Sequence, residues 1–152
     1  MRVIFLDFDG VLNRETDAID EESELWTAAW LESDLVERLA RLVASTGAKV
    51  VVSSSWRQRR SLAELADILA ERGYPGGVHD VTARLPRSEE GEQHVRATEI
   101  AAWLTAHPEV ANWIILDDER DLGPLAHRHV WTDPSVGLSE QNLVEARALL
   151  LG

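Results

Sequence analysis

Two carboxylates, Asp7 and Asp9, follow directly on a run of four apolar residues, Val3–Leu6. A carboxylate held rigidly at the end of a strand can attack phosphorus as a nucleophile. Side chains alternate along an extended chain, so a carboxylate two positions later shares that side and can handle protons. Gly10 then allows the backbone to turn sharply and to approach a ligand closely. The pattern favours phosphoryl chemistry; the alternative is a strand that ends at Asp7, followed by an ordinary Asp-Gly turn.

Polar residues also follow directly on two later apolar runs. Ser53–Ser55 follow Lys49–Val52, and Asp117 and Asp118 follow Trp113–Leu116. Ligands of open parallel α/β sheets bind at the carboxyl ends of the strands, so these groups and the N-terminal acidic pair meet at one edge if the strands are parallel. Four carboxylates close together repel one another. A hard, oxygen-seeking cation such as Mg²⁺ is therefore the expected counterion.

Expected strands and helices alternate along the chain. Short apolar runs are typical of buried strands, whereas amphipathic segments with capping and stop signals are typical of helices. Ser61-Leu-Ala-Glu64, for example, is a capping-box pattern, and Gly47 is a typical helix stop. We expect strands at Val3–Leu6, Lys49–Val52, Val78–Val81 (an edge strand), Trp113–Leu116 and His129–Trp131, and helices from Ser33 to Gly47, from Ser61 to Gly73, from Arg96 to about His107, and from Ser139 onward.

This alternation predicts an α/β fold with a mostly parallel sheet covered by helices on both faces. A chain of 152 residues with 45% apolar residues is long and apolar enough for one domain, residues 1–152, with a substantial core. The chain contains no Cys, which excludes a disulfide framework and a thiolate nucleophile or metal ligand.

The net charge of −12 argues against broad, non-specific binding to long nucleic acids, because an acidic surface repels their phosphates. It leaves room for a local basic pocket. The N-terminal apolar run is too short for a signal peptide, and no stretch approaches the roughly 20 apolar residues that span a bilayer. We therefore expect a soluble, cytoplasmic protein without a membrane partner. The sequence carries no signal for an oligomeric state.

Asp7-Phe-Asp9-Gly10-Val-Leu resembles the first motif, Asp-x-Asp-Gly-(Val/Thr)-(Leu/Val), of the haloacid dehalogenase (HAD) superfamily of phosphohydrolases. The resemblance spans nearly the whole chain and implies a three-layer, Rossmann-like HAD fold with about five strands. It implies that Asp7 becomes an aspartyl phosphate, and that Asp9 protonates the leaving group and then activates water. Both would also bind Mg²⁺, Asp9 through its backbone carbonyl. A dehalogenase is expected to lack a carboxylate at position 9, so Asp9 favours phosphate chemistry.

The strand that ends in Ser53 resembles the second HAD motif, in which a Ser or Thr hydrogen-bonds the transferring phosphoryl group. The resemblance implies Ser53, with Ser54 beside it, as phosphate-binding residues. Ser55 is the rival, because Ser55-Trp56-Arg57 resembles the Ser-x-Arg element of polynucleotide kinase-phosphatases, and in that register Arg57 also binds phosphate. Capping of the turn is the alternative for Ser54 and Ser55. Trp56 offers a surface for base stacking, with core packing as its alternative.

The third HAD motif is a basic residue, usually Lys, at the start of the helix before the acidic pair. The only Lys of this chain is Lys49, so the best match is Arg96, with Arg84 and Arg87 as weaker candidates. The resemblance implies that Arg96 binds the phosphoryl group. Arg in place of Lys departs from the commonest pattern of the superfamily.

Ile114-Ile-Leu-Asp117-Asp118-Glu-Arg-Asp121 resembles the fourth motif, the acidic Mg²⁺ pair. The resemblance implies Asp118 as a direct ligand of the ion. Asp117 is either a second ligand or a partner of metal-bound water. Asp121 would not bind the ion directly but would contact the residues or water molecules that do.

Five segments together resemble the small HAD domain of the Swiss Army Knife RNA repair proteins. They are FLDFDGVLN, VVVSSSWR, RATEIAAWL, ILDDERD and GLSEQN. That group is associated with end-healing of nucleic acids. Many HAD enzymes carry a cap domain that closes over small substrates, but the two usual insertion points are too short here for a full cap. We therefore expect a capless or minimally capped enzyme that is open to a phosphorylated nucleic-acid end or nucleotide.

Two alternatives remain open. Trp26 and Trp30 form a helical apolar face or fold over the site as a small lid, and a lid would favour a small phosphorylated metabolite. A receiver-like or other phosphate-binding module also gathers Asp residues at strand ends. A receiver, however, is expected to have its phosphoacceptor on a middle strand and a Lys late in the chain, and this chain has neither.

Overall fold

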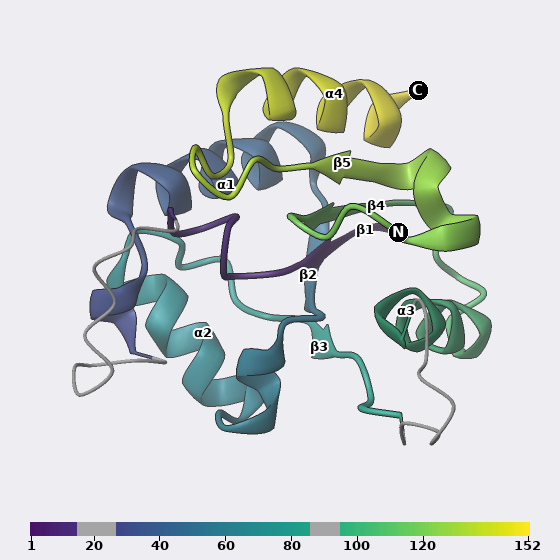
Figure 1. Ribbon diagram of the computed structural model, residues 1–152, viewed down its shortest axis with the longest axis horizontal. Helices are drawn as coiled ribbons and strands as arrows, with labels where there is room; N and C mark the ends of the chain where they lie inside the picture. The colour runs from purple at the N-terminus through teal and green to yellow at the C-terminus, as the bar shows by residue number, and fades with distance from the viewer. Residues whose placement is uncertain (15–26, 86–94) are drawn as a thin grey trace.

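A five-stranded, parallel sheet forms the centre of the computed structural model, which describes residues 1–14, 27–85 and 95–152 (Figure 1). The strand order is β3-β2-β1-β4-β5, so the chain starts in the middle of the sheet and extends first to one edge and then to the other. The predicted α/β fold is confirmed, although the predicted edge strand at Val78–Val81 is shorter. The strands are β1 (Arg2–Leu6), β2 (Lys49–Val52), β3 (Asp80–Val81), β4 (Asn112–Asp117) and β5 (His129–Trp131).

The helices begin and end close to the predicted positions. Ser61 and Ser139 are N-caps with complete capping boxes, and Gly47 ends its helix in the left-handed conformation with a φ of 70°. Ser33 is the first helical residue, and Glu32 occupies the N-cap position. The α-helices are α1 (Ser33–Thr46), α2 (Leu62–Glu71), α3 (Val95–Ala106) and α4 (Glu140–Leu151), and the 3-10 helices are η1 (Ala28–Trp30), η2 (Ser55–Gln58) and η3 (Gly123–Arg128).

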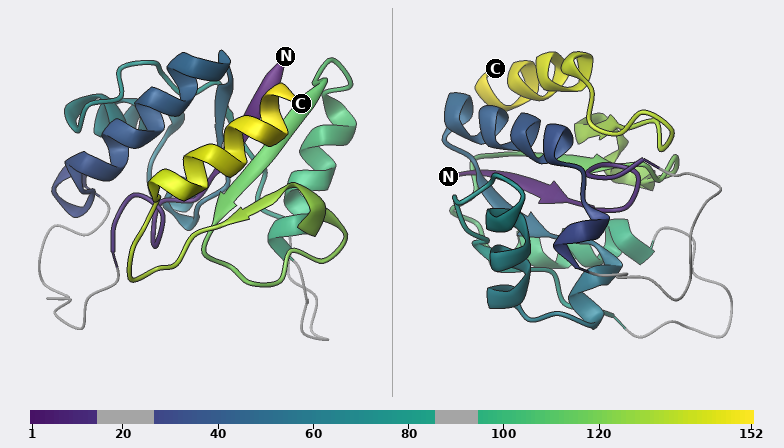
Figure 2. Two further views of the ribbon diagram at one scale, coloured as in Figure 1. Left: turned by 90° about the horizontal axis from the view of Figure 1, so that it is seen from above. Right: turned by 90° about the vertical axis from the view of Figure 1, so that its left-hand side faces the viewer.

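Helices cover both faces of the sheet. Ile4 and Leu6 of β1 belong to the larger core, which α1, α2 and α4 complete, whereas Val3 and Phe5 belong to the smaller core under α3. Figure 2 shows α1 and α4 side by side on their face of the sheet. Burial on both faces explains why the strands read as uninterrupted apolar runs. Within the described ranges, no helix is both long enough and apolar enough to cross a membrane.

Candidate active site

The carboxyl ends of three strands lie next to one another at one edge of the sheet. Ser53, Asp7 and Asp117 occupy neighbouring positions across β2, β1 and β4. The amide nitrogen of Ser53 lies 3.0 Å from the carbonyl oxygen of Leu6, and that of Asp7 lies 3.0 Å from the carbonyl oxygen of Leu116. Leu6 and Leu116 point into the larger core, so alternation turns the three polar side chains toward the face covered by α3.

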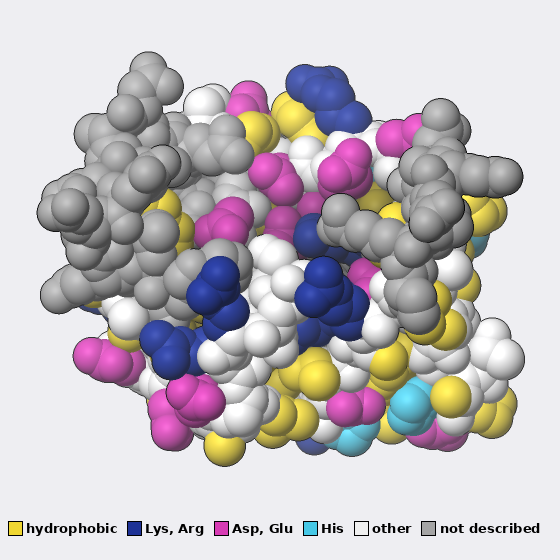
Figure 3. All heavy atoms as spheres, turned by 60° about the horizontal axis from the view of Figure 1, so that its bottom comes forward, with side chains coloured by type: hydrophobic (Ala, Val, Ile, Leu, Met, Phe, Trp, Pro, Cys, Tyr) yellow, Lys and Arg dark blue, Asp and Glu magenta, His cyan; other side chains and the backbone are white. Residues whose placement is uncertain are grey.

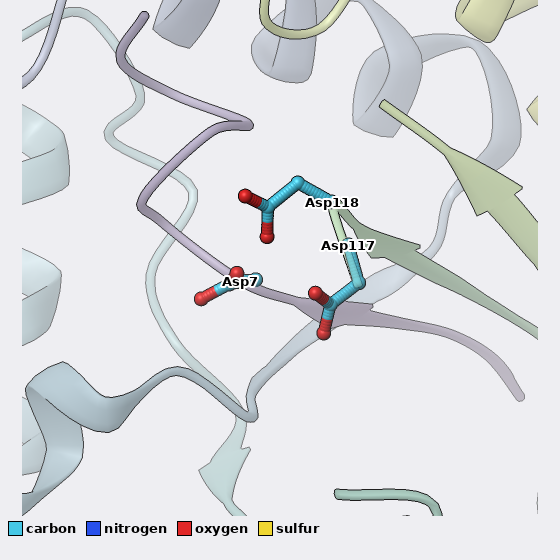
Figure 4. Close-up of side chains that lie close together, drawn as sticks. All are labelled: Asp7, Asp117 and Asp118. Atoms are coloured by element: carbon cyan, nitrogen blue, oxygen red, sulfur yellow. The ribbon is translucent and has the colours of Figure 1, made fainter. Parts of the chain in front are cut away.

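Asp7, Asp117 and Asp118 bring their carboxylates together at this edge. Each offers one oxygen atom, and these atoms lie within 4.8 Å of one another (Figure 4). Gly10 is required beside them, because its φ of 77° is left-handed and a Cβ there would clash with the Asp118 carboxylate. Three carboxylate oxygens around one point fit a hard divalent cation such as Mg²⁺. In the space-filling view, acidic side chains gather near the middle of the face, with basic side chains beside them (Figure 3).

Arg96, near the start of α3, contacts two of these three carboxylates. Its Nη1 lies 2.6 Å from Oδ2 of Asp117 and 3.1 Å from Oδ2 of Asp7. Burial raises the pKa of Asp7 well above its usual range and the charge of Asp117 raises it further, while Arg96 opposes both effects. Burial alone would lower the pKa of the Arg96 guanidinium, but the charges of Asp7 and Asp117 raise it. The site thus combines excess negative charge, suited to a cation, with one fixed positive group, suited to a phosphoryl oxygen.

The carboxylate of Asp9 points to other partners and is not part of the acidic cluster formed by Asp7, Asp117 and Asp118. It accepts hydrogen bonds from Asn13 and from the indole N–H groups of two tryptophans. The Mg²⁺ contact that the HAD resemblance implies for Asp9 uses the backbone carbonyl, so this orientation leaves it possible. The two indole donors were not anticipated from the sequence, because they lie 21 and 47 residues away along the chain.

The serine cluster after β2 divides between two roles. Ser53 is fully buried, and its Oγ has no hydrogen-bond partner among the described residues. A buried hydroxyl without a partner is costly unless a ligand or water satisfies it, so Ser53 suits a phosphoryl oxygen. Ser54 is also fully buried, but its Oγ accepts from the amide of Trp56 and caps η2. The structure therefore gives Ser54 the capping role that was its alternative. Ser55 is half-buried in η2.

Arg57, which we predicted to bind phosphate, is instead bonded to groups of the protein itself. Its side chain is only 6% exposed and pairs with Glu99 of α3 at 2.7 Å. Nη1 donates to the carbonyl oxygens of Ser53 and Ser54, each at 2.8 Å, and Nε donates to that of Thr82 at 2.9 Å. These bonds use most of the guanidinium donors. We did not identify Glu99 from the sequence. The available signal was its position three residues after Arg96, which places both residues on the same side of the helix.

Trp56 is a core residue in place of the predicted stacking surface. It is 1% exposed, and its ring meets that of Phe8 edge-on, with centroids 4.9 Å apart. A base cannot stack on a ring that is already enclosed. The alternative of core packing at the strand end is therefore the one that the structure shows.

Several further candidates lie away from the acidic cluster. Asp121 is exposed and is not one of the three clustered carboxylates, and its Oδ1 accepts from the amide of Gly123 at the start of η3. Arg84 is exposed, and Arg96 rather than Arg84 contacts the acidic cluster. Trp26 and Arg87 lie outside the described residues.

Residues at and after β5 support the site, and we did not identify them from the sequence. Trp131 Nε1 donates to the carbonyl oxygen of Asp118 at 2.9 Å, and Thr132 Oγ1 donates to that of Gly10 at 2.9 Å. The strand register could have indicated Trp131, because it pairs with Asp117 across the sheet. These bonds fix the backbone on either side of the acidic cluster.

Comparison with known proteins gave one match. A family model described as the HAD domain in Swiss Army Knife RNA repair proteins matches residues 3–143. The matched range includes the whole acidic cluster, Ser53 and Arg96. Neither curated proteins nor solved structures gave a match.

Proposed function

Because the chain belongs to the family of HAD domains in Swiss Army Knife RNA repair proteins, we propose that it is a Mg²⁺-dependent phosphatase whose Asp7 becomes an aspartyl phosphate. Membership supports the general class, a HAD-type phosphatase with a phosphorylated substrate. One observation carries the mechanism: the nearly buried carboxylate of Asp7 lies among those of Asp117 and Asp118, with Arg96 at 3.1 Å.

In the first step, a carboxylate oxygen of Asp7 attacks phosphorus. The new O–P bond forms as the bond from phosphorus to the leaving oxygen breaks, and Asp9 gives that oxygen its proton. Arg96 and the hydroxyl of Ser53 donate to the phosphoryl oxygens, where charge is spread in the transition state. The leaving group departs as a neutral alcohol.

In the second step, Asp9 is a carboxylate and acts as the base. It takes a proton from water while the water oxygen attacks phosphorus, and the bond between phosphorus and Asp7 breaks. Inorganic phosphate leaves, Asp7 is a free carboxylate again, and Asp9 carries the proton for the next cycle. Protons and charges balance over the two steps.

Asp7, Asp117 and Asp118 would hold the Mg²⁺ ion. Their carboxylate oxygen atoms, within 4.8 Å of one another, are the donor set that a hard cation prefers. The ion would supply positive charge that lets an anionic nucleophile meet an anionic phosphate. Arg96 alone cannot balance the three carboxylates.

We propose a phosphorylated nucleic-acid end or a nucleotide as the substrate. The family description, which refers to RNA repair proteins, supports this class. The described elements between β2 and β4 are η2, α2, β3 and α3, and none of them adds a separate cap domain. Among the described residues of this segment, the lack of a cap favours a large substrate.

A small phosphorylated metabolite is the second candidate, and the position of Trp30 favours it. The indole of Trp30 lies 3.2 Å from Asp9, so η1 lies beside the proposed acid, as a small lid would. The burial of Trp56 also removes the stacking surface that had favoured a nucleobase.

Phosphate release in the presence of Mg²⁺ tests the proposal. The substrates to compare are 3′- and 5′-phosphorylated oligonucleotides, mononucleotides and sugar phosphates, each with wild type and with Asp7→Asn. We expect release from oligonucleotide ends, and we expect its loss in Asp7→Asn with an unchanged circular dichroism spectrum. A preference for sugar phosphates would favour the second candidate. Full activity in Asp7→Asn would refute the aspartyl phosphate.

A further inference from the structure

Two tryptophans from distant segments donate to the carboxylate of Asp9. Nε1 of Trp30 lies 3.2 Å from Oδ1, and Nε1 of Trp56 lies 3.2 Å from Oδ2. Asn13 Nδ2 adds a third bond, 2.9 Å from Oδ1. We propose that Trp30 and Trp56, the indole pair, are positioning residues that aim Asp9 for proton transfer. This inference rests on the acid–base role of Asp9 proposed above.

The chemistry of the donors selects one oxygen of Asp9. An indole N–H and an amide NH₂ donate and cannot accept, and each carboxylate oxygen has two lone-pair positions. Among the described residues, Oδ1 accepts from Asn13 and Trp30, which fills both of its positions, whereas Oδ2 accepts only from Trp56. Oδ2 therefore keeps acceptor capacity, and it is the oxygen that carries the transferred proton.

Packing and hydrogen bonds within the protein hold both indole rings in place. Trp56 is 1% exposed, and its ring is held against Phe8, which lies between the two reactive carboxylates in the sequence. Trp30 packs partly against the larger core, and Arg72 Nε donates to the carbonyl oxygen of Ala28, at the start of the same 3-10 helix, at 2.6 Å. Rigid donors on both oxygens resist rotation of the carboxylate.

Aim matters for this residue because proton transfer is short-ranged. A general acid works at about 2.6–3.2 Å from the leaving oxygen, and a displacement of roughly 1 Å can cost about 10²-fold in rate. Loss of one indole N–H should thus impair leaving-group protonation more than attack by Asp7. The rate should therefore fall strongly for a substrate with a poor leaving group, which needs protonation, and little for a substrate with a good leaving group.

The test compares kcat/KM for phenyl phosphate and p-nitrophenyl phosphate, two esters of similar shape. Only the phenolate of the first needs substantial protonation as it leaves, and kcat/KM covers the steps up to its departure. In Trp30→Phe and Trp56→Phe we expect the loss for phenyl phosphate to exceed the loss for p-nitrophenyl phosphate by about tenfold or more. Trp103→Phe is the matched control: that buried indole donates to Asp80 at 2.7 Å, and Asp80 is not part of the acidic cluster. Its two losses should be equal.

Equal losses on both esters in Trp30→Phe would overturn the positioning role while leaving the phosphatase proposal intact. Trp30 is only partly buried, so this variant carries the test if Trp56→Phe fails to fold. No phosphate release by wild type from any ester would overturn the phosphatase proposal and the acid role of Asp9 together. Indole ¹H–¹⁵N resonances give a readout without turnover. Asp9→Ala should shift those of Trp30 and Trp56 but not that of Trp103, and unshifted resonances would refute the indole pair.

Discussion

Arg96 reaches from helix α3 to Asp7 at the end of strand β1, with 3.1 Å between Nη1 and Oδ2. The contact partly compensates a buried carboxylate that its acidic neighbours would otherwise repel. It also puts a permanent positive charge beside the proposed nucleophile, where a phosphoryl oxygen would arrive. An arginine thus stands where the third HAD motif usually has a lysine.

Removing this charge should slow turnover strongly. We expect Arg96→Ala to lower kcat/KM for phosphate release by about 10²- to 10³-fold, the usual effect of losing one donor to transition-state charge. Arg96→Lys should retain part of the activity, because the charge remains but the forked donor is lost. Arg147→Ala, which removes an arginine bonded to Ser45 on the surface, is the control. Wild-type activity in Arg96→Ala would show that Arg96 has no part in catalysis.

Arg57 should matter for stability because it is buried with Glu99. Arg57→Ala leaves a carboxylate that is 6% exposed without its charged partner, and we expect it to lower the free energy of unfolding by about 3–5 kcal/mol. Urea denaturation measures this loss. Arg60→Ala, at an exposed pair with Glu64, should change it little. An Arg57→Ala protein of normal stability but raised KM would restore the phosphate-binding role that the structure argues against.

Mg²⁺ should stabilise the folded protein through the acidic cluster. At a concentration of 100 times its Kd, an ion that binds only the folded state adds about 2.7 kcal/mol, which thermal unfolding with and without EDTA would detect. Asp118→Ala should abolish the Mg²⁺-dependent rise in Tm. Asp121→Ala should preserve it, because Asp121 bonds to Gly123 at the start of η3. Equal rises in wild type and Asp118→Ala would place the ion elsewhere.

Without metal, Asp7→Asn should be more stable than wild type at neutral pH. Burial and Asp117 raise the pKa of Asp7, so the folded state holds this proton more tightly than the unfolded state. The ionised group therefore costs stability above its folded pKa, and the cost fades as the pH falls toward the ordinary Asp pKa of about 3.9. We expect Tm to rise by about 4 °C in Asp7→Asn with EDTA near neutral pH, and the difference to shrink in acid. A lower Tm in Asp7→Asn would contradict the electrostatic account.

The edge that carries the site could be predicted because it follows from local patterns. Asp7, Ser53 and Asp117 each come directly after an apolar run, and parallel strands bring such positions together. Arg96 could be proposed because it opens a helix just before the acidic pair. The meeting of the three strand ends needs only element order and the direction of the strands, whereas Arg96 was proposed from the resemblance to the third HAD motif.

The side-chain partners could not be predicted in the same way. Arg57 follows a serine cluster and looked like a phosphate ligand, but its charge is used by Glu99, which lies 42 residues later. Trp56 looked like a stacking surface beside arginines, yet the turn at η2 rotates its ring against Phe8. Such outcomes depend on which side chains tertiary packing brings within reach, and spacing along the chain does not report that.

The central claim is that Asp7 carries the phosphoryl group during turnover. Rapid acid quenching of wild type with a p-nitrophenyl phosphate substrate and Mg²⁺, followed by peptide mass spectrometry, tests it most directly. We predict that the peptide containing Asp7 gains the mass of one phosphoryl group, and that Asp7→Asn shows no such gain. Turnover without a phosphorylated Asp7 peptide, or with the phosphoryl group on another residue, would contradict the mechanism.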